Sequence, residues 1–427
     1  MTPEVVSVRV VRIYHAGRDQ AHRARERALV AQGMDLRLVV PTTWPGPSGG
    51  LESEPFDVVQ LDVERAGDVN RHRYSDANAL CRAVNECQPD VVDVHEEPVS
   101  VVARQVLDAV GTTPVVMYTA QNLDKRWPPP FAGMERRALS RVAAFYPCSR
   151  QAASVLRGKG YRGHVRVLPL GLDPAVHHPG EQDLGSDPEV VLGLVGRLVP
   201  EKGLRDAVDV LAAVRGGRPA RLLVIGEGPD QAAGRARAEQ RGVADAVERQ
   251  PWLDAAGLAA AYRRMHVVLV PSRATATWVE QFGRVITEGM ANGAVPIGYA
   301  SGSIPEVIGV EGVATPEGDV ATLSATVLDL LADPPRWTAL RSAGLMRAAE
   351  IDWSAIAAGM VEMYEQALWT GAPGTVRPDR ATAVQEFGPP ARTSVSARPF
   401  ALPVLRESPL AHKLLEPATD LVGRWRG

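Results

Sequence analysis

The sequence is poor in cysteine, in lysine and in long apolar runs. Its three cysteines, Cys81, Cys87 and Cys148, are odd in number and match no metal-ligand spacing, so we expect reduced thiols. No apolar run reaches the length of a membrane span, and the N-terminus lacks a signal-peptide core. A formal charge of −3 over 427 residues gives no case for nucleic-acid binding. These absences predict a cytoplasmic globular protein.

Lysine occurs at only four positions in a chain that is otherwise rich in arginine: Lys125, Lys159, Lys202 and Lys413. Such a bias indicates a GC-rich bacterial genome. It also makes each remaining lysine informative, because an ammonium is a compact charge and a guanidinium is a planar fork.

What the chain does contain is a regular alternation of short apolar runs with helical patterns. Hydrophobic residues make up 45% and charged residues 23%, as in ordinary globular proteins. Strand, helix, strand in this order predicts parallel βαβ units and doubly wound sheets. The predicted strands are Val6–Ile13, Leu36–Val40, Phe56–Leu61, Val91–Val94, Pro114–Tyr118, Val165–Leu168, Val190–Val195, Arg221–Ile225, Val267–Val270 and Ala294–Ile297.

The most informative stretch follows the predicted strand Val267–Val270. A loop carries Glu280, Phe282 and Gly283, and a helical pattern then runs to about residue 292 with Glu288 on it. The N-terminus of that helix offers unpaired N–H groups and a positive dipole end, which suit a phosphate. Two carboxylates on either side of a phosphate-binding helix N-terminus could bind a ligand that has a diphosphate in the middle and sugar hydroxyls at both ends. The pattern therefore favours a nucleotide-sugar over two solvated surface glutamates.

A second loop joins two cations to a strand end. Arg197 and Lys202 follow the strand Val190–Val195 and stand just before a predicted helix, between Gly196 and Gly203. Two cations at a helix entrance are suited to a diphosphate leaving group. The short Gly226-Glu227-Gly228 turn is too incomplete to indicate a dinucleotide site.

Taken together, Gly-Arg … Glu-Lys-Gly and Glu-x-Phe-Gly-x4-Glu resemble the signatures of family 4 retaining glycosyltransferases of the GT-B fold, over roughly residues 5–370. The resemblance implies two Rossmann-like domains that face each other across a cleft, with a C-terminal helix crossing back. It implies that Glu280 binds donor-sugar hydroxyls, Glu288 the ribose, and Arg197 and Lys202 the diphosphate. One departure is Ser301-Gly302-Ser303, where many members carry a Gly-Gly pair.

The same resemblance implies a front-face mechanism, in which the leaving phosphate helps to deprotonate the acceptor. No carboxylate nucleophile is assigned, and the reaction is expected to need no metal and no cofactor besides the nucleotide-sugar.

In the first half of the chain, His95 ends the strand Val91–Val94, where ligands of open α/β sheets bind. By resemblance it contacts the donor sugar, while the alternative is a histidine that bonds a loop carbonyl. Gly17 matches a loop that approaches the diphosphate, although the doubled glycine usual there is missing. Gln121, Asn122 and Lys125 form a loop that faces the acceptor by resemblance, or a structured surface loop otherwise.

The predicted domains are an N-terminal acceptor-side domain (1–173, completed by a helix at 353–370) and a C-terminal donor domain (174–352). Residues 371–427 form a tail rich in Pro, Arg and Ser, whose composition predicts a linker with a short terminal helix. That helix would dock on the enzyme or at the inner face of the membrane. The basic segment 134–144 raises the same alternatives, a solvated face or a peripheral membrane contact.

The predicted function is transfer of a hexosyl group from a UDP- or GDP-sugar to a hydroxyl acceptor, in the synthesis of a glycolipid, a polysaccharide or a glycosylated metabolite. Two alternatives stay open: another GT-B enzyme such as a nucleotide-sugar 2-epimerase, and a non-catalytic subunit that binds a nucleotide-sugar.

Overall fold

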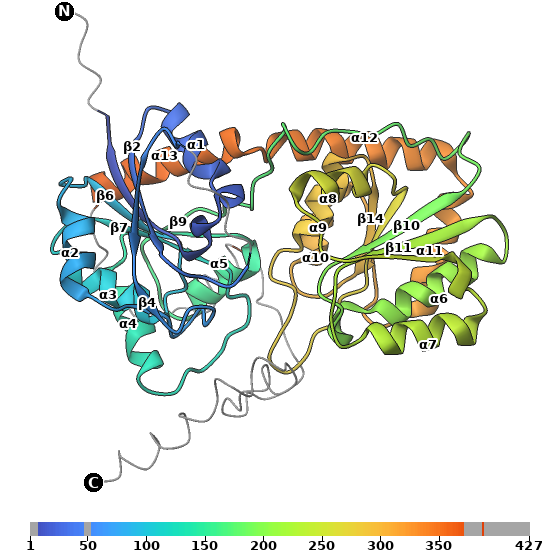
Figure 1. The fold of residues 1–427 in the computed structure, drawn as a ribbon, viewed down its shortest axis with the longest axis horizontal. Coiled ribbons are helices and arrows are strands. Elements are labelled where there is room, and N and C mark those ends of the chain that lie inside the picture. The colour runs from blue at the N-terminus through green and yellow to red at the C-terminus, as the bar shows by residue number, and fades with distance from the viewer. Residues whose placement is uncertain (1–6, 47–52, 371–386, 388–427) are drawn as a thin grey trace, which may run out of the picture.

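The protein contains two all-parallel sheets, one in each half of the chain (Figure 1). The computed structural model describes residues 7–46, 53–370 and 387. Val6, the first residue of the predicted strand Val6–Ile13, and the predicted tail 371–427, apart from residue 387, therefore lie outside the described residues. The GT-B arrangement expected from the sequence is confirmed, with two Rossmann-like domains and a last helix that returns to the first.

The first domain is built on a seven-stranded sheet in the order β3-β2-β1-β6-β7-β8-β9. Its strands are β1 (Arg9–Ile13), β2 (Asp35–Pro41), β3 (Asp57–Leu61), β6 (Val91–Val94), β7 (Val115–Thr119), β8 (Ala144–Pro147) and β9 (His164–Val165). Its helices are α1 (Ala24–Ala31), α2 (Ala77–Asn85), α3 (Val101–Ala109), α4 (Phe131–Arg141) and α5 (Arg150–Gly158). The strand order changes direction between β1 and β6, which makes the ends of these two strands a topological switch point.

The second domain has a six-stranded sheet in the order β12-β11-β10-β13-β14-β15. Its strands are β10 (Val190–Val195), β11 (Ala220–Ile225), β12 (Val247–Gln250), β13 (Val267–Val270), β14 (Val295–Tyr299) and β15 (Val313–Thr315). Its helices are α6 (Leu204–Arg215), α7 (Gln231–Arg241), α8 (Ala255–Tyr262), α9 (Arg284–Ala291), α10 (Ile304–Ile308), α11 (Val320–Leu331) and α12 (Pro334–Glu350).

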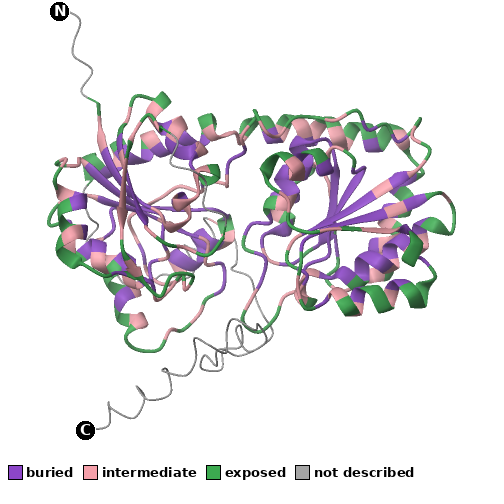
Figure 2. Ribbon diagram, viewed as in Figure 1, coloured by how far each residue is buried: buried purple, intermediate pink, exposed green. Residues whose placement is uncertain are grey.

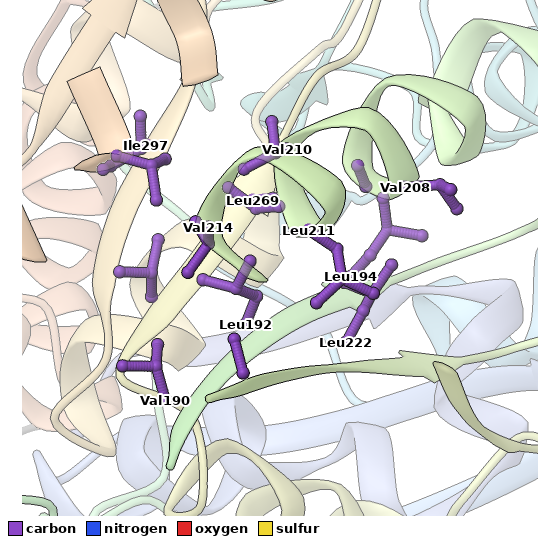
Figure 3. Close-up of a cluster of buried hydrophobic side chains, with 14 of the residues drawn as sticks. Val190, Leu192, Leu194, Val208, Val210, Leu211, Val214, Leu222, Leu269 and Ile297 are labelled. Carbon is purple, nitrogen blue, oxygen red and sulfur yellow. The ribbon is translucent and has the colours of Figure 1, made fainter. Parts of the chain in front are cut away.

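Both sheets are covered by helices, which explains why their strands are runs of apolar residues rather than alternating patterns. Figure 2 shows most strands as buried ribbons, while exposed residues lie on the outer sides of the helices and in the loops. In the second domain, Val208 and Leu211 of α6 pack on Leu192 and Leu222 of the sheet (Figure 3). Such unbroken Val/Leu/Ile runs are the reason the strands were predictable.

The chain passes between the domains twice, and the two passages pair with each other. Leu172 forms a parallel bridge with Asp352. The Leu172 N–H donates to the Ile351 carbonyl at 3.1 Å, and the Leu172 carbonyl accepts from the Trp353 N–H at 3.0 Å. Helix α13 (Trp353–Thr370) then lies against α1, where Met360 and Tyr364 join the core formed by Val10 and other residues of the first sheet.

Several strands were not predicted: β8, β12 and β15 of the two large sheets, and a small antiparallel pair formed by β4 (Val63–Glu64) and β5 (Arg73–Tyr74). Two residues, as in β4 and β5, are too few to show a period.

The three cysteines are free. None of the described helices combines the length and apolar character needed to cross a bilayer. In α4, two of the basic side chains contact the domain itself, Arg137 at Asp108 and Arg141 at the Gly111 carbonyl.

The contact between the two passages predicts a stability effect. A Cβ at Gly171 would lie 2.4 Å from the Trp353 ring. We expect Gly171→Ala to lower the free energy of unfolding by about 1–3 kcal/mol, the usual cost of overpacking. Gly133→Ala is the control, because a Cβ there meets nothing within 4 Å and should leave stability unchanged or slightly raised. Urea denaturation of both variants measures this. Equal stability of the two variants would contradict the packing argument.

Candidate functional site

The candidate site lies where loops from the carboxyl ends of both sheets meet. Asn122, in the loop after β7, donates its side-chain amide to the Glu280 carbonyl at 2.7 Å, in the loop after β13. Close by, the Gln151 amide donates to the Gly302 carbonyl at 2.6 Å, and the Arg150 N–H donates to the Glu306 carboxylate at 2.7 Å. The first turn of α5 is thus bonded by the other domain. These contacts bring the predicted residues of both halves to one place.

The loop after β10 carries Arg197 and Lys202. Lys202 ends a short 3-10 helix (Pro200–Lys202), and Gly203 begins α6 with a left-handed φ of +72°. A Cβ at Gly203 would lie 2.3 Å from the Pro271 carbonyl oxygen, so only glycine lets this loop approach the end of β13. That approach is what places Lys202 next to the loop of Glu280. Arg197 is exposed.

Lys202 and Glu280 form an ion pair, with the Lys202 ammonium 2.5 Å from Oε2 of Glu280. The two side chains are 20% and 10% exposed, so solvent screens the pair only partly. The Ser272 hydroxyl donates to the same carboxylate oxygen at 3.2 Å, and the ammonium lies 5.0 Å from the centre of the Trp278 ring. The predicted diphosphate cation and the predicted sugar carboxylate are therefore direct partners.

Helix α9 follows, with Gly283 before it at a φ of +82° and no side chain capping its first turn. Phe282 is buried in the core between the domains, which anchors the loop. Glu288, two turns further on than Glu280, is 7% exposed. Its carboxylate accepts a hydrogen bond from the Tyr262 hydroxyl at 3.1 Å and lies 3.2 Å from Arg284.

His95 is buried at the end of β6. Its ring packs on Tyr118 at a centroid distance of 4.0 Å and edge-on against Tyr14 at 4.5 Å. The Arg25 guanidinium donates to Nδ1 of His95 at 2.9 Å. An arginine can only donate, so Nδ1 is the acceptor and the ring proton is on Nε2. Burial, followed by the nearby Arg25 and Arg12 charges, holds the pKa of His95 well below its usual range. His95 is therefore a neutral hydrogen-bond donor.

A buried polar network supports this ring. The Tyr146 hydroxyl lies 3.1 Å from Nδ1 of His95 and donates to Asp93 at 2.5 Å. Asp93 also accepts from the Arg12 guanidinium and from the Tyr364 hydroxyl, the latter at 2.6 Å. Since Tyr364 belongs to α13, the returning helix is hydrogen-bonded to the carboxylate that also holds Tyr146, and the Tyr146 ring stacks beside His95.

The remaining predicted residues have varied surroundings. Asn122 is 1% exposed and bonds the other domain, so its side chain serves the domain interface and does not face open acceptor space. Gln121 caps its own loop by accepting from the Leu123 N–H at 3.2 Å. Burial lowers the pKa of Lys125, whose ammonium lies 5.7 Å from the centre of the Trp127 ring. Gly17 is buried, and a Cβ there would lie 3.0 Å from Tyr14. Packing alone therefore accounts for the glycine.

Several residues of the site carried no sequence signal. Arg25 lies 70 positions before His95, and Ser272 and Trp278 have no recognisable spacing to Lys202. Two acidic residues, Glu96 and Glu97, follow His95 directly in the sequence. Glu97 accepts from the Thr119 hydroxyl at 2.6 Å and from the Ala120 N–H at 2.8 Å, so it organises the loop after β7. Burial raises the pKa of Glu97.

Two family models match the chain. The model described as "Glycosyl transferases group 1" matches residues 181–345, and the "Glycosyl transferase 4-like domain" matches residues 20–171. The matched segments contain the whole second sheet and all strands of the first sheet except β1.

Individual relatives agree with the family models. A D-inositol 3-phosphate glycosyltransferase of Segniliparus rotundus is 34% identical over 226 residues, which are 50% of this chain and 49% of that protein. An MMP alpha-(1->4)-mannosyltransferase of Mycolicibacterium hassiacum is 27% identical over 56% of this chain and 57% of that protein. The chain thus spans about half the length of the curated relatives it matches.

Among solved structures, the Anabaena protein HepE, determined with UDP and glucose, matches with a TM-score of 0.64. The match covers 83% of this chain and 99% of that one at 16% identity. At this identity the likeness supports the fold alone.

The burial of neutral His95 predicts a pH dependence of stability. Below the ordinary pKa of about 6.5, the unfolded chain binds a proton at this position and the folded chain does not, so stability falls as the pH falls. Between pH 7.5 and pH 5.5 this one group should account for about 1.4 kcal/mol. We expect His95→Gln to lose that share of the pH dependence, as measured by urea denaturation at both pH values. An unchanged pH dependence would contradict a neutral, buried His95.

Proposed function

This chain belongs to the group 1 glycosyltransferases, and we propose that it moves a hexosyl group from a nucleoside diphosphate sugar to a hydroxyl acceptor with retention of configuration. The observation that carries the proposal is the ion pair between Lys202 and Glu280 at the mouth of the second sheet. It places a cation suited to a diphosphate beside a carboxylate suited to sugar hydroxyls. A group that can bind the diphosphate and a group that can bind the sugar hydroxyls of a nucleotide-sugar therefore lie in direct contact.

The ion pair is also a reason for ligand-dependent rearrangement. While the site is empty, each partner compensates the charge of the other. A diphosphate carries more negative charge than one carboxylate and competes for the Lys202 ammonium, while the sugar hydroxyls donate to the released carboxylate of Glu280. Arg197, which is exposed after β10, is free to close on the same phosphates. The uncapped first turn of α9 adds N–H donors.

The nucleoside end is assigned to Glu288. One oxygen of this carboxylate accepts from Tyr262 and the other faces Arg284, which fixes the orientation of the group. A carboxylate held in this way accepts hydrogen bonds from the two adjacent hydroxyls of a ribose. Glu280 then serves the sugar and Glu288 the nucleoside, as the resemblance to family 4 enzymes implies.

For the transfer itself, the β-phosphate gains negative charge as the sugar leaves. Lys202, Arg197 and the α9 N-terminus stabilise that charge, and we expect no divalent metal to be needed for this task. The leaving phosphate takes the proton of the acceptor hydroxyl on the same face, so no protein nucleophile is assigned. The neutral His95 donates a hydrogen bond from its Nε2–H to the sugar. It therefore orients the ring without adding a charge.

The donor class is tested by a thermal-shift screen of UDP-, GDP- and ADP-sugars on the full chain, without and then with a divalent cation. We expect stabilisation by one nucleotide class without added metal, because ligands that bind only the folded state raise its stability. Stabilisation by none of them would contradict the proposal.

Lys202→Ala tests the carrying observation. We expect kcat/KM for donor consumption to fall by roughly 10²–10³-fold, the effect of losing one pre-organised charge on a developing anion. The control is Arg205→Ala, at the second residue of α6, where the side chain is 54% exposed and lies 3.8 Å from Asp230. The kcat/KM of both variants is measured from the rate at which the nucleoside diphosphate is released. A near-normal value for Lys202→Ala would refute the assignment.

A further inference from the structure

A cluster of three side chains in the first domain takes no part in the donor site described above. His15 follows β1, Glu96 follows β6, and His72 ends the loop between β4 and β5. Each offers one ligand atom, and these atoms all lie within 4.8 Å of one another. The cluster thus forms at the topological switch point of the first sheet, beside His95.

His72 presents an unused lone pair to this cluster. Its Nδ1 lies 3.0 Å from the Asp68 carbonyl oxygen, which can only accept, so the ring proton is on Nδ1. Nε2 is then an acceptor, and it is buried without a hydrogen-bond partner. The side chain is 1% exposed, and Nε2 lies 3.9 Å from Oε1 of Glu96. A lone pair that faces a carboxylate is unfavourable unless a cation lies between them.

Glu96 is a buried carboxylate whose hydrogen bonds come from His15. Its side chain is 2% exposed, and within the described ranges no arginine or lysine forms an ion pair with it. Its contacts are the His15 N–H at 2.9 Å and Nδ1 of His15 at 2.7 and 2.8 Å. Burying a carboxylate is costly unless a charge compensates it.

An aromatic side chain covers both imidazoles. The Trp44 ring lies 4.4 Å from the His15 ring and 4.8 Å from the His72 ring, measured between centroids. It limits access of water on that side. His15, which is 19% exposed, leaves the other side of the cluster open.

We propose that His15, His72 and Glu96 bind a divalent ion of the zinc class. Two imidazoles and one carboxylate are a ligand set of zinc sites that keep an open position, whereas Mg²⁺ and Ca²⁺ prefer oxygen ligands. His15 contributes Nδ1 once its proton moves to Nε2. The ion supplies positive charge to Glu96 and a partner for Nε2 of His72. All three residues belong to the first domain, whereas Lys202 and Arg197 belong to the second.

The test uses the full chain, stripped with a chelator and then titrated with Zn²⁺ against a chromophoric competitor. We expect one equivalent to bind and to raise the melting temperature. Co²⁺ in place of Zn²⁺ should give the visible absorption of a low-coordinate site and quench tryptophan fluorescence. Trp44→Phe should remove most of that quenching while Co²⁺ still binds.

His72→Gln and Glu96→Gln should lower Zn²⁺ affinity by roughly 100-fold or more, since even an outer-shell partner of a metal ligand is worth about 10–100-fold. His15→Gln, at the partly exposed position, gives a third variant if a buried one fails to fold. His164→Gln in β9, outside the cluster, is the matched control and should retain full affinity. No Zn²⁺ bound by the unaltered chain, or equal affinity in the cluster variants and the control, would overturn the proposal. Nucleoside diphosphate binding, measured with and without Zn²⁺, should not change, so this result stands or falls separately from the proposed transfer.

Discussion

The whole arrangement depends on the paired passage of the chain at Leu172 and Asp352. The chain crosses from the first domain to the second and later returns, and the two crossings are hydrogen-bonded side by side. A double crossing restricts twisting of the domains but leaves a hinge between them. It sets the carboxyl ends of the two sheets toward each other, where Asn122 reaches the Glu280 carbonyl. Because of this constraint, each half supplies loops to one candidate site.

The charges of the site follow a common logic. Groups meant to meet the donor are paired but partly exposed, as Lys202 and Glu280 are, so a ligand can replace the partner. Groups that only hold position are fully buried and satisfied, as Asp93 is by Arg12, Tyr146 and Tyr364. His95 joins the two classes, since it is buried and neutral but keeps one N–H to donate. The returning helix α13 contributes Tyr364 to the hydrogen bonds that hold Asp93.

Much of the fold was predictable from local pattern. The boundaries of β6, β10 and β13 were predicted to the residue, because buried parallel strands leave strong signals in sequence. The two motif loops were predictable for the same reason. Pairing across long separations was not: Lys202 and Glu280 are 78 positions apart, and Asn122 and Glu280 are 158 apart. Nothing in the composition of either loop indicates that Asn122 serves the domain interface, because that role arises only when two separately folded sheets are set face to face.

The central claim is that the second domain binds a nucleoside diphosphate sugar with its two ends on different carboxylates. Calorimetry with the plain nucleoside diphosphate tests it most directly, because that ligand has a ribose and a diphosphate but no sugar. The account predicts that Glu288→Gln weakens its binding, while Glu280→Gln, which releases Lys202, leaves it equal or tighter. Equal losses in both variants would contradict separate roles for the two glutamates, and unimpaired binding to Glu288→Gln would contradict the ribose assignment.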